Sequence, residues 1–201
     1  MKPRALALGI ATAALLATGA CNNKDNNANG PLSAQTPKAQ KAAGSKTIAA
    51  GIPATSQFMA AAKAAGLDQT LAGPGPYTVF VPDDAAFGQA PAGTFDAKPE
   101  NRAQLTGVLT NLILPGTVLA ADIEKAIDSG KGKAVLATMG GGTLTAAKEG
   151  GKTVLTDAAG HKATITQADE QFTNGVVHRV DAVLMPSKAA AGPAVGKKAG
   201  S

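Results

Sequence analysis

Hydrophobic and polar residues alternate in two segments that lie far apart in the chain, and each segment ends at a proline. The first segment, residues 77–82, is rich in β-branched and aromatic residues, and its alternation predicts a strand. Pro82 has no N–H to donate to a sheet, so the strand should stop there, and Asp83 can then cap a short helix. The second segment opens at Asn174-Gly175, a hairpin dipeptide whose residues favour positive φ, and a long strand should follow it.

Apolar residues recur at helical spacing before the first segment and again after it. Thr55 or Ser56 can cap a helix that Gly66 ends, and Pro99 suits the first turn of another helix. The later helix is expected to bury one face, formed by residues at positions i, i+3, i+4 and i+7: Leu105, Val108, Leu109 and Leu112.

The second half of the chain changes to short alternating runs separated by glycine-rich turns. Five strands are predicted, at residues 134–138, 143–147, 153–156, 163–168 and 176–185. Their hairpin spacing predicts an antiparallel meander, partly covered by the helices of the first half. The fold class is therefore α+β, a single domain over residues 46–187 in which antiparallel β-strands pack with several short helices. About 140 residues is enough for one hydrophobic core.

Residues 1–21 are typical of a signal peptide with a lipobox-like cleavage site. A basic start precedes an apolar run at residues 5–17, which is shorter than the about 20 residues that a membrane span needs. Residues 18–21 resemble a bacterial lipobox, in which small residues precede a cysteine that becomes diacylated. Thr18 departs from this pattern, which prefers leucine or another aliphatic residue there.

Cys21 is the single cysteine, so an intrachain disulfide is excluded and lipidation explains an unpaired thiol in an exported chain. The alternative is a leftover cysteine in an ordinary signal peptide. Asn22 is not the aspartate that retains many Gram-negative lipoproteins at the inner membrane, so we expect an exported cell-envelope protein, held at the outer membrane through lipidated Cys21. Residues 22–45 are predicted to form a disordered tether, and residues 188–201 a disordered tail.

The positive charge of the chain lies outside the predicted domain. The whole chain carries +5, but residues 46–187 hold 11 basic and 13 acidic residues, a net charge of −2. The domain also has no basic run interleaved with aromatic residues that could stack on bases. These observations exclude nucleic acid as the expected partner.

Together, the two proline-ended segments resemble the two signature blocks of the fasciclin domain, an extracellular adhesion and interaction module. The resemblance extends over residues 46–187 and is carried by Tyr77, Phe80, Pro82, Asp83, Phe87, Asn174, Gly175, His178, Asp181 and Pro186. It implies a non-enzymatic fold with a protein or glycan partner. Strand alternation places His178 on the apolar face, where we expect a packed, hydrogen-bonded core histidine. It places Arg179 and Asp181 together on the opposite face, where we expect them to pair at the surface.

Two further places resemble interaction sites of the family. Asn111 and Leu112 stand where the family usually carries a Tyr-His pair, and this departure affects any adhesive role at that place. Asp122-Ile123 matches a short segment linked to receptor binding in animal fasciclin domains. The residues themselves favour a plainer interpretation, in which Ile123 and Ile127 are core contacts and Asp122 is a solvated charge at a helix start.

The candidate catalytic patterns have simpler explanations. Gly150-Gly151-Lys152 imitates the end of a phosphate-binding loop, but it lies between two predicted strands and reads as a hairpin turn. His161 and His178 are the two histidines, and nothing near them has metal-ligand spacing. We therefore expect no enzyme, no metal and no cofactor.

The leading hypothesis is a non-enzymatic, lipid-anchored envelope protein whose fasciclin-like domain mediates adhesion or binds proteins or glycans. A carrier of an apolar small molecule, such as a carotenoid or lipid in a groove between helices and sheet, is the alternative. The low aromatic content, with one tyrosine and five phenylalanines, argues against the carrier. A passive envelope spacer is a third alternative.

Overall fold

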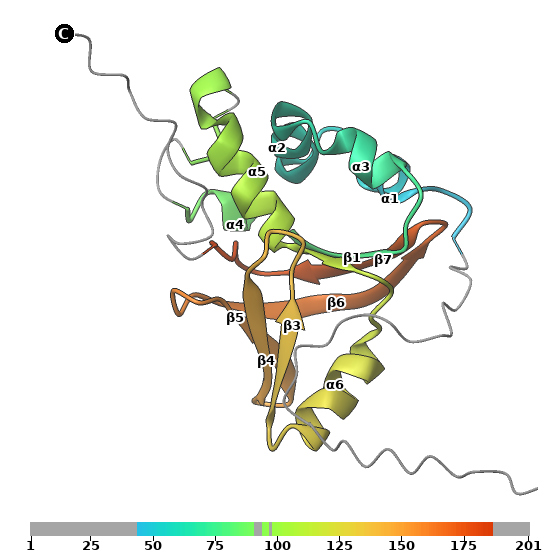
Figure 1. The fold of residues 1–201 in the computed structure, drawn as a ribbon, viewed down its shortest axis with the longest axis vertical. Helices are drawn as coiled ribbons and strands as arrows, with labels where there is room; N and C mark the ends of the chain where they lie inside the picture. Colours follow the sequence, from blue (N-terminus) through green and yellow to red (C-terminus); the bar gives the residue numbers. More distant parts are fainter. Residues whose placement is uncertain (1–43, 91–93, 97, 187–201) are drawn as a thin grey trace, which may run out of the picture.

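The computed structural model describes residues 44–90, 94–96 and 98–186. The predicted signal peptide, Cys21, nearly all of the tether and the tail lie outside these residues. Within them, helices gather on one side of a curved sheet, and a separate helix lies at the other side (Figure 1). This arrangement confirms the α+β class.

The sheet has seven strands in the order β2-β1-β7-β6-β5-β4-β3 within the described part of the chain. The strands are β1 Tyr77–Pro82, β2 Ile113–Pro115, β3 Lys133–Ala137, β4 Thr143–Glu149, β5 Lys152–Thr156, β6 Lys162–Phe172 and β7 Gly175–Val180. Strands β3 to β7 form the predicted antiparallel meander, but β1 and β7 pair in parallel. The sheet is therefore mixed, which corrects the antiparallel prediction at its centre.

The helices are α1 Ile48–Gly51, α2 Gln57–Ala65, α3 Asp68–Ala72, α4 Asp84–Phe87, α5 Arg102–Asn111 and α6 Ala120–Ser129, with a 3₁₀ turn at Pro99–Asn101. Ser56 caps α2, since its side chain accepts a hydrogen bond from the Met59 backbone N–H. Gly66 ends the same helix with a φ of 78°, in the left-handed region that glycine adopts without a Cβ clash. Both predicted boundaries of this helix are confirmed.

One continuous core lies between the helices and the sheet. The predicted face of α5 is buried, with Leu105 and Leu112 fully inaccessible. The largest wholly buried side chains come from both layers and include Ile48, Phe58, Leu71, Phe80, Leu109, Ile113, Leu114, Ile123 and Ile127. This burial removes apolar area from water and stabilises the arrangement of the two layers.

The hairpin between β6 and β7 differs from the predicted turn. Phe172 pairs with Gly175, so the two loop residues are Thr173 and Asn174, and Gly175 is the first residue of β7. Asn174 does not take a positive φ, and its side chain is held in the interior by the hydrogen bonds described below. The Gly150-Gly151 turn agrees with its prediction, since both glycines have positive φ between paired Glu149 and Lys152.

Strand β7 is shorter than predicted and ends at Val180. Asp181 bonds to Thr164 twice: its carboxylate accepts from the Thr164 N–H at 2.6 Å, and its own N–H donates to the Thr164 carbonyl oxygen at 3.1 Å. The predicted pairing of Arg179 with Asp181 is therefore wrong. Arg179 instead pairs with Glu170 on β6, at 2.9 Å between Nε and Oε1. Asp83 also holds the N-cap position of α4 without the predicted side-chain capping bond.

Candidate functional site

The two signature segments lie side by side as neighbouring inner strands of the sheet. Strand β1 pairs with β7 from Tyr77 opposite Gly175 to Pro82 opposite Val180. Gly175 permits this close approach, because a Cβ on it would lie 2.0 Å from the Tyr77 carbonyl oxygen. The segments thus meet as partners, and their residues form the centre of the domain.

His178 is fully buried at this centre and makes a hydrogen bond through each ring nitrogen. Its Nδ1 lies 3.2 Å from the backbone N of Asp169, which can only donate, so Nδ1 accepts and the proton sits on Nε2. Nε2 then donates to the Val118 carbonyl oxygen at 2.9 Å. Burial lowers the pKa of His178, opposed by the Val118 hydrogen bond and the nearby Asp169 and Glu170 carboxylates. The expectation of a packed, hydrogen-bonded core histidine agrees with this geometry.

Asn174 joins the β6–β7 hairpin to the helical layer. Its Oδ1 accepts from the Ile48 N–H, and its Nδ2 donates to the carbonyl oxygens of Leu71 and Gly73, all at 2.8 Å. One buried amide therefore satisfies backbone groups at α1 and at the end of α3. Such groups would otherwise be costly to bury.

Thr78 provides a second buried polar connection. Its hydroxyl donates to the Gly116 carbonyl oxygen and accepts from the Val118 N–H, each at 2.8 Å. The segment that leads into α6 is thereby fixed to β1. Of the signature residues, Asn174 and His178 connect elements through buried hydrogen bonds, Phe80 and Phe87 belong to the apolar core, and Asp83 and Asp181 are exposed.

The three candidate interaction residues have very different exposure. Ile123 is fully buried and Asn111 is 2% exposed, so neither side chain has surface to offer a partner in this conformation. Asp122 is exposed, and its Oδ2 accepts from the Leu119 N–H at the start of α6. Ile127 is buried as well, which confirms the core interpretation of both isoleucines.

Asn111 has an unusual environment for a buried amide. Its Oδ1 lies 3.3 Å from the Thr138 hydroxyl, while its Nδ2 has no hydrogen-bond partner. The loop Thr138–Gly142 covers it and is held by backbone bonds from Met139 N to Ile113 O and from Gly140 N to Thr110 O. The loop joins β3 to β4 along the chain, and its bond to Ile113 brings it into contact with β2, the strand at the opposite edge of the sheet.

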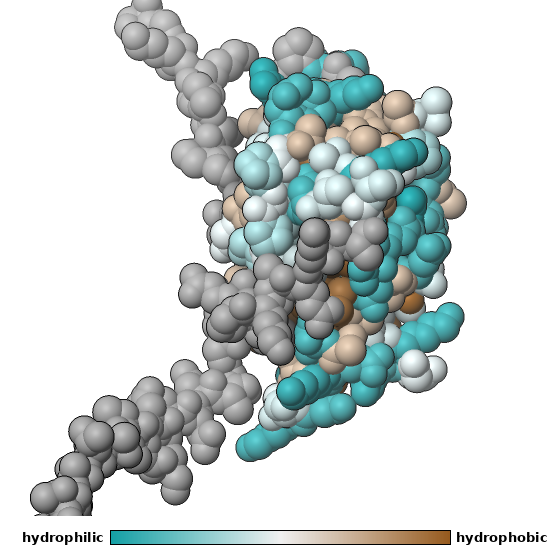
Figure 2. Space-filling model, turned by 90° about the vertical axis from the view of Figure 1, so that its right-hand side faces the viewer, coloured by the Kyte–Doolittle hydropathy of each residue, from teal (hydrophilic) through white to brown (hydrophobic). Residues whose placement is uncertain are grey.

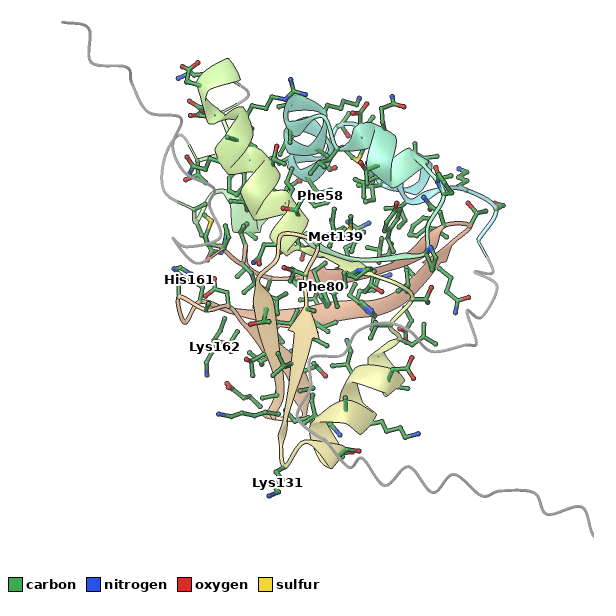
Figure 3. The ribbon with its side chains drawn as sticks, viewed as in Figure 1. Phe58, Phe80, Lys131, Met139, His161 and Lys162 are labelled. Atoms are coloured by element: carbon green, nitrogen blue, oxygen red, sulfur yellow. The ribbon has the colours of Figure 1, made fainter. Side chains whose placement is uncertain are left out.

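Met139 is a residue that the sequence patterns do not single out. It is 44% exposed, the one large apolar side chain that is exposed in the described part of the chain. Figure 3 places it on the loop between β3 and β4, beside the end of α5. Three consecutive glycines after it are the signal in the sequence that could have marked this loop as a surface feature.

His161 lies away from this centre and belongs to a turn. Its Nδ1 is 2.8 Å from Asp157 Oδ2, and its side chain is 56% exposed (Figure 3). Asp157 is buried and also accepts from the backbone N–H groups of Ala159, His161 and Met185, so the pair stabilises the turn and the end of the domain. Among residues 44–90, 94–96 and 98–186, no group of three or more His, Cys, Asp or Glu residues could hold a metal ion.

The surface is mixed in character. Figure 2 shows hydrophilic residues over much of one face, with apolar residues in small scattered groups. Charged side chains pair locally, as Lys148 does with Glu124 and Asp128, and Lys162 with Glu149. Such exposed pairs contribute little to stability but keep the surface polar.

In the described part of the chain, a helical layer packs on a mixed sheet, and buried polar side chains connect the two. A model of the fasciclin domain family matches residues 53–186. The chain therefore belongs to the fasciclin domain family.

Several relatives support this membership. Protein sll1483 from Synechocystis sp. is 38% identical over 142 residues, which cover 69% of this chain and 71% of that protein. The transforming growth factor-beta-induced protein ig-h3 from Sus scrofa is 33% identical over 130 residues, covering 65% of this chain and 17% of that protein. Immunogenic protein MPB70 from Mycobacterium bovis is 30% identical over 112 residues, which cover 56% of this chain and 51% of that protein.

A solved structure shares the fold. The FAS1 domain pair from the insect cell adhesion molecule fasciclin I matches with a TM-score of 0.56 at 19% identity, covering 73% of this chain and 53% of that one. The family is known for adhesion-related proteins that are generally not enzymes. In the described part of this chain, none of the helices has the length and apolar character that a membrane crossing requires.

Proposed function

We propose that this chain is an exported envelope protein whose fasciclin domain mediates adhesion by binding proteins or glycans, held at the membrane by lipidated Cys21. The observation that carries the proposal is the match of the fasciclin domain family to residues 53–186, in a chain whose residues 18–21 resemble a lipobox. The structural neighbour is an adhesion molecule by its description, which supports the same class of activity here.

In the proposed mechanism, each domain binds its partner weakly, and many copies on one membrane together give firm attachment. Several exposed charged groups pair locally, and the described surface presents a single large apolar side chain, Met139, so one domain offers little apolar area to a partner. Many domains tethered to one membrane would convert such weak contacts into firm attachment, because each later contact forms at high effective concentration. The residues before the domain would serve as the spacer.

The experiment compares the full mature chain in two forms. Soluble monomer and beads coated at increasing density are offered to cells of the host strain, with beads coated by an unrelated protein of similar charge as the control. The proposal expects negligible retention of monomer and a steep rise of bead attachment with density. Bead attachment equal to the control at every density would contradict it.

A companion measurement tests the alternative that the chain carries an apolar small molecule. Protein purified from its native host would show a visible absorption band or an extractable lipid in stoichiometric amount if it carried such a molecule. The adhesion proposal expects neither.

The anchor is tested separately by mass spectrometry of the mature N-terminus. We expect a first residue at Cys21 carrying a diacylglyceryl group, and we expect Cys21→Ala to release the protein in soluble form. Asn22→Asp is the matched variant, since it keeps the lipid and should shift a Gram-negative lipoprotein to the inner membrane. An unmodified N-terminus at another position would contradict the anchor and leave the bead experiment unaffected.

A further inference from the structure

The start of α6 is held by side chains from three different strands. Thr78 of β1 accepts from the Val118 N–H at 2.8 Å, and His178 of β7 donates to the Val118 carbonyl oxygen at 2.9 Å. Asp169 of β6 accepts through Oδ1 from the N–H of Ala120, the first residue of the helix, at 2.8 Å. The helix N-terminus therefore depends on a buried histidine and on a carboxylate beside it.

Asp169 serves the helix and the histidine at the same time. It adopts a φ of 60°, in the left-handed region, where the register between β6 and β7 shifts. This bulge directs the Asp169 backbone N–H to His178 Nδ1 and the carboxylate to Ala120. Its Oδ1 also lies 3.9 Å from Nδ1, just beyond hydrogen-bond distance.

Protonation of His178 changes what this geometry can support. The bond from the Asp169 N–H requires a lone pair on Nδ1, and a protonated ring has none. The new N–H at Nδ1 needs an acceptor, and the Asp169 carboxylate is the anion in reach. Glu170, the other carboxylate on β6 that acts on the ring, is engaged with Arg179 at 2.9 Å. From β1, Phe80 faces the ring with an uncharged side chain.

We propose that His178 and Asp169 form an acid-sensitive latch on α6. When His178 takes up a proton, the Asp169 carboxylate moves from the Ala120 N–H to the imidazolium, and the first turn of α6 is released. Figure 1 shows α6 apart from the helical layer, beside β3 and β4, so its first turn can loosen while the other helices stay packed on the sheet. Release would uncover Val118 and Ile123, which are buried in the structure. This device does not depend on the adhesion proposal.

The test follows single sites in the full chain by NMR. Hydrogen-exchange protection of the Ala120 amide and the ring resonances of His178 are measured between pH 7.5 and the onset of global unfolding. We expect the Ala120 protection factor to fall roughly tenfold or more, because a charge-assisted hydrogen bond is lost. The pH at the midpoint of this fall should equal the midpoint of the His178 titration. His161→Gln should leave both midpoints unchanged.

Asp169→Asn isolates the carboxylate. Asparagine tolerates the left-handed backbone and keeps an oxygen acceptor for Ala120, but it offers no anion to a protonated histidine. We expect Ala120 to stay protected to lower pH in this variant. The latch would be overturned if Ala120 protection did not change as His178 titrates, or if Ala120 lost protection at the same pH in Asp169→Asn as in the unmodified chain. It would also be overturned if His178 stayed neutral until the whole domain unfolds.

Discussion

Phe80 of β1 stacks on His178 of β7, with ring centroids 5.5 Å apart and planes inclined by 29°. The two residues occupy paired positions in the parallel part of the sheet. One residue from each signature segment thus forms a single buried contact, and the histidine is neutral there because its Nδ1 accepts from a backbone N–H. The stability of the domain should therefore depend on the charge of this one ring.

The first prediction concerns pH. Burial lowers the pKa of His178 in the folded domain below its ordinary value of 6.5, so the unfolded chain binds the proton more readily. The contribution of His178 to the free energy of unfolding is therefore complete above that ordinary pKa and is lost as the pH falls below it. Urea unfolding at a series of pH values between 7.5 and 5 should show this loss.

The controls separate His178 from the other titrating groups. His178→Gln should be less stable at neutral pH and should have a shallower pH dependence than the unmodified chain over the same range. His161→Gln should keep the full dependence. If the free energy of unfolding fell with pH equally in His178→Gln and in the unmodified protein, a group other than His178 would cause the pH dependence.

The second prediction concerns Asn174. Replacement by alanine leaves the Ile48 N–H and the carbonyl oxygens of Leu71 and Gly73 without their partner. We expect Asn174→Ala to lower the free energy of unfolding by about 3 kcal/mol or more, since buried unsatisfied groups are expensive. Chemical denaturation measures this, with exposed Gln89→Ala expected to change stability by less than about 0.5 kcal/mol. A loss under about 1 kcal/mol for Asn174→Ala would be the contrary result.

The third prediction contrasts two glycines. A Cβ at Gly175 would lie 2.0 Å from the Tyr77 carbonyl oxygen, whereas a Cβ at Gly107, inside α5, meets nothing within 4 Å. Gly175→Ala should therefore separate β1 from β7 and lower the melting temperature strongly. Gly107→Ala should raise stability by about 0.5–1 kcal/mol, because alanine favours the helix. Similar effects of the two substitutions would contradict the close pairing of the strands.

The fourth prediction concerns the amide of Asn111. Leucine has a similar shape and removes the buried Nδ2 that lacks a partner, while the Thr138 hydroxyl keeps the Gly142 carbonyl oxygen as an acceptor at 3.1 Å. Asn111→Leu should be neutral or stabilising by about 1 kcal/mol. Thermal unfolding decides this, and a clear loss of stability would indicate that the amide has a partner in solution.

Local patterns predicted the elements of this fold well where local physics decides. The apolar spacing in α5, the cap at Ser56 and the glycine end at Gly66 all depend on residues within one or two turns. The hairpin at Gly150-Gly151 depends on positive φ in two adjacent residues. These features agree with the structure because neighbouring residues determine them.

Features that depend on distant residues could not be predicted in the same way. Strand alternation identifies a buried face but not the direction of the partner strand, so the parallel pairing of β1 and β7 was missed. The register of β6 against β7 shifts between Gln167 and Glu170, and Arg179 forms its ion pair with Glu170 instead of the predicted pair with Asp181. The role of Asp169 itself appears only when β6, β7 and α6 are seen together.

The most direct measurement of the central claim is attachment of living cells. A deletion strain is complemented with the unmodified chain, with Cys21→Ala, or with nothing, and attached cells are counted after washing. We predict that the unmodified chain restores attachment. Cys21→Ala should fold but be released from the membrane, and it should not restore attachment. Equal attachment of all three strains would contradict the claim that a membrane-tethered fasciclin domain acts in adhesion.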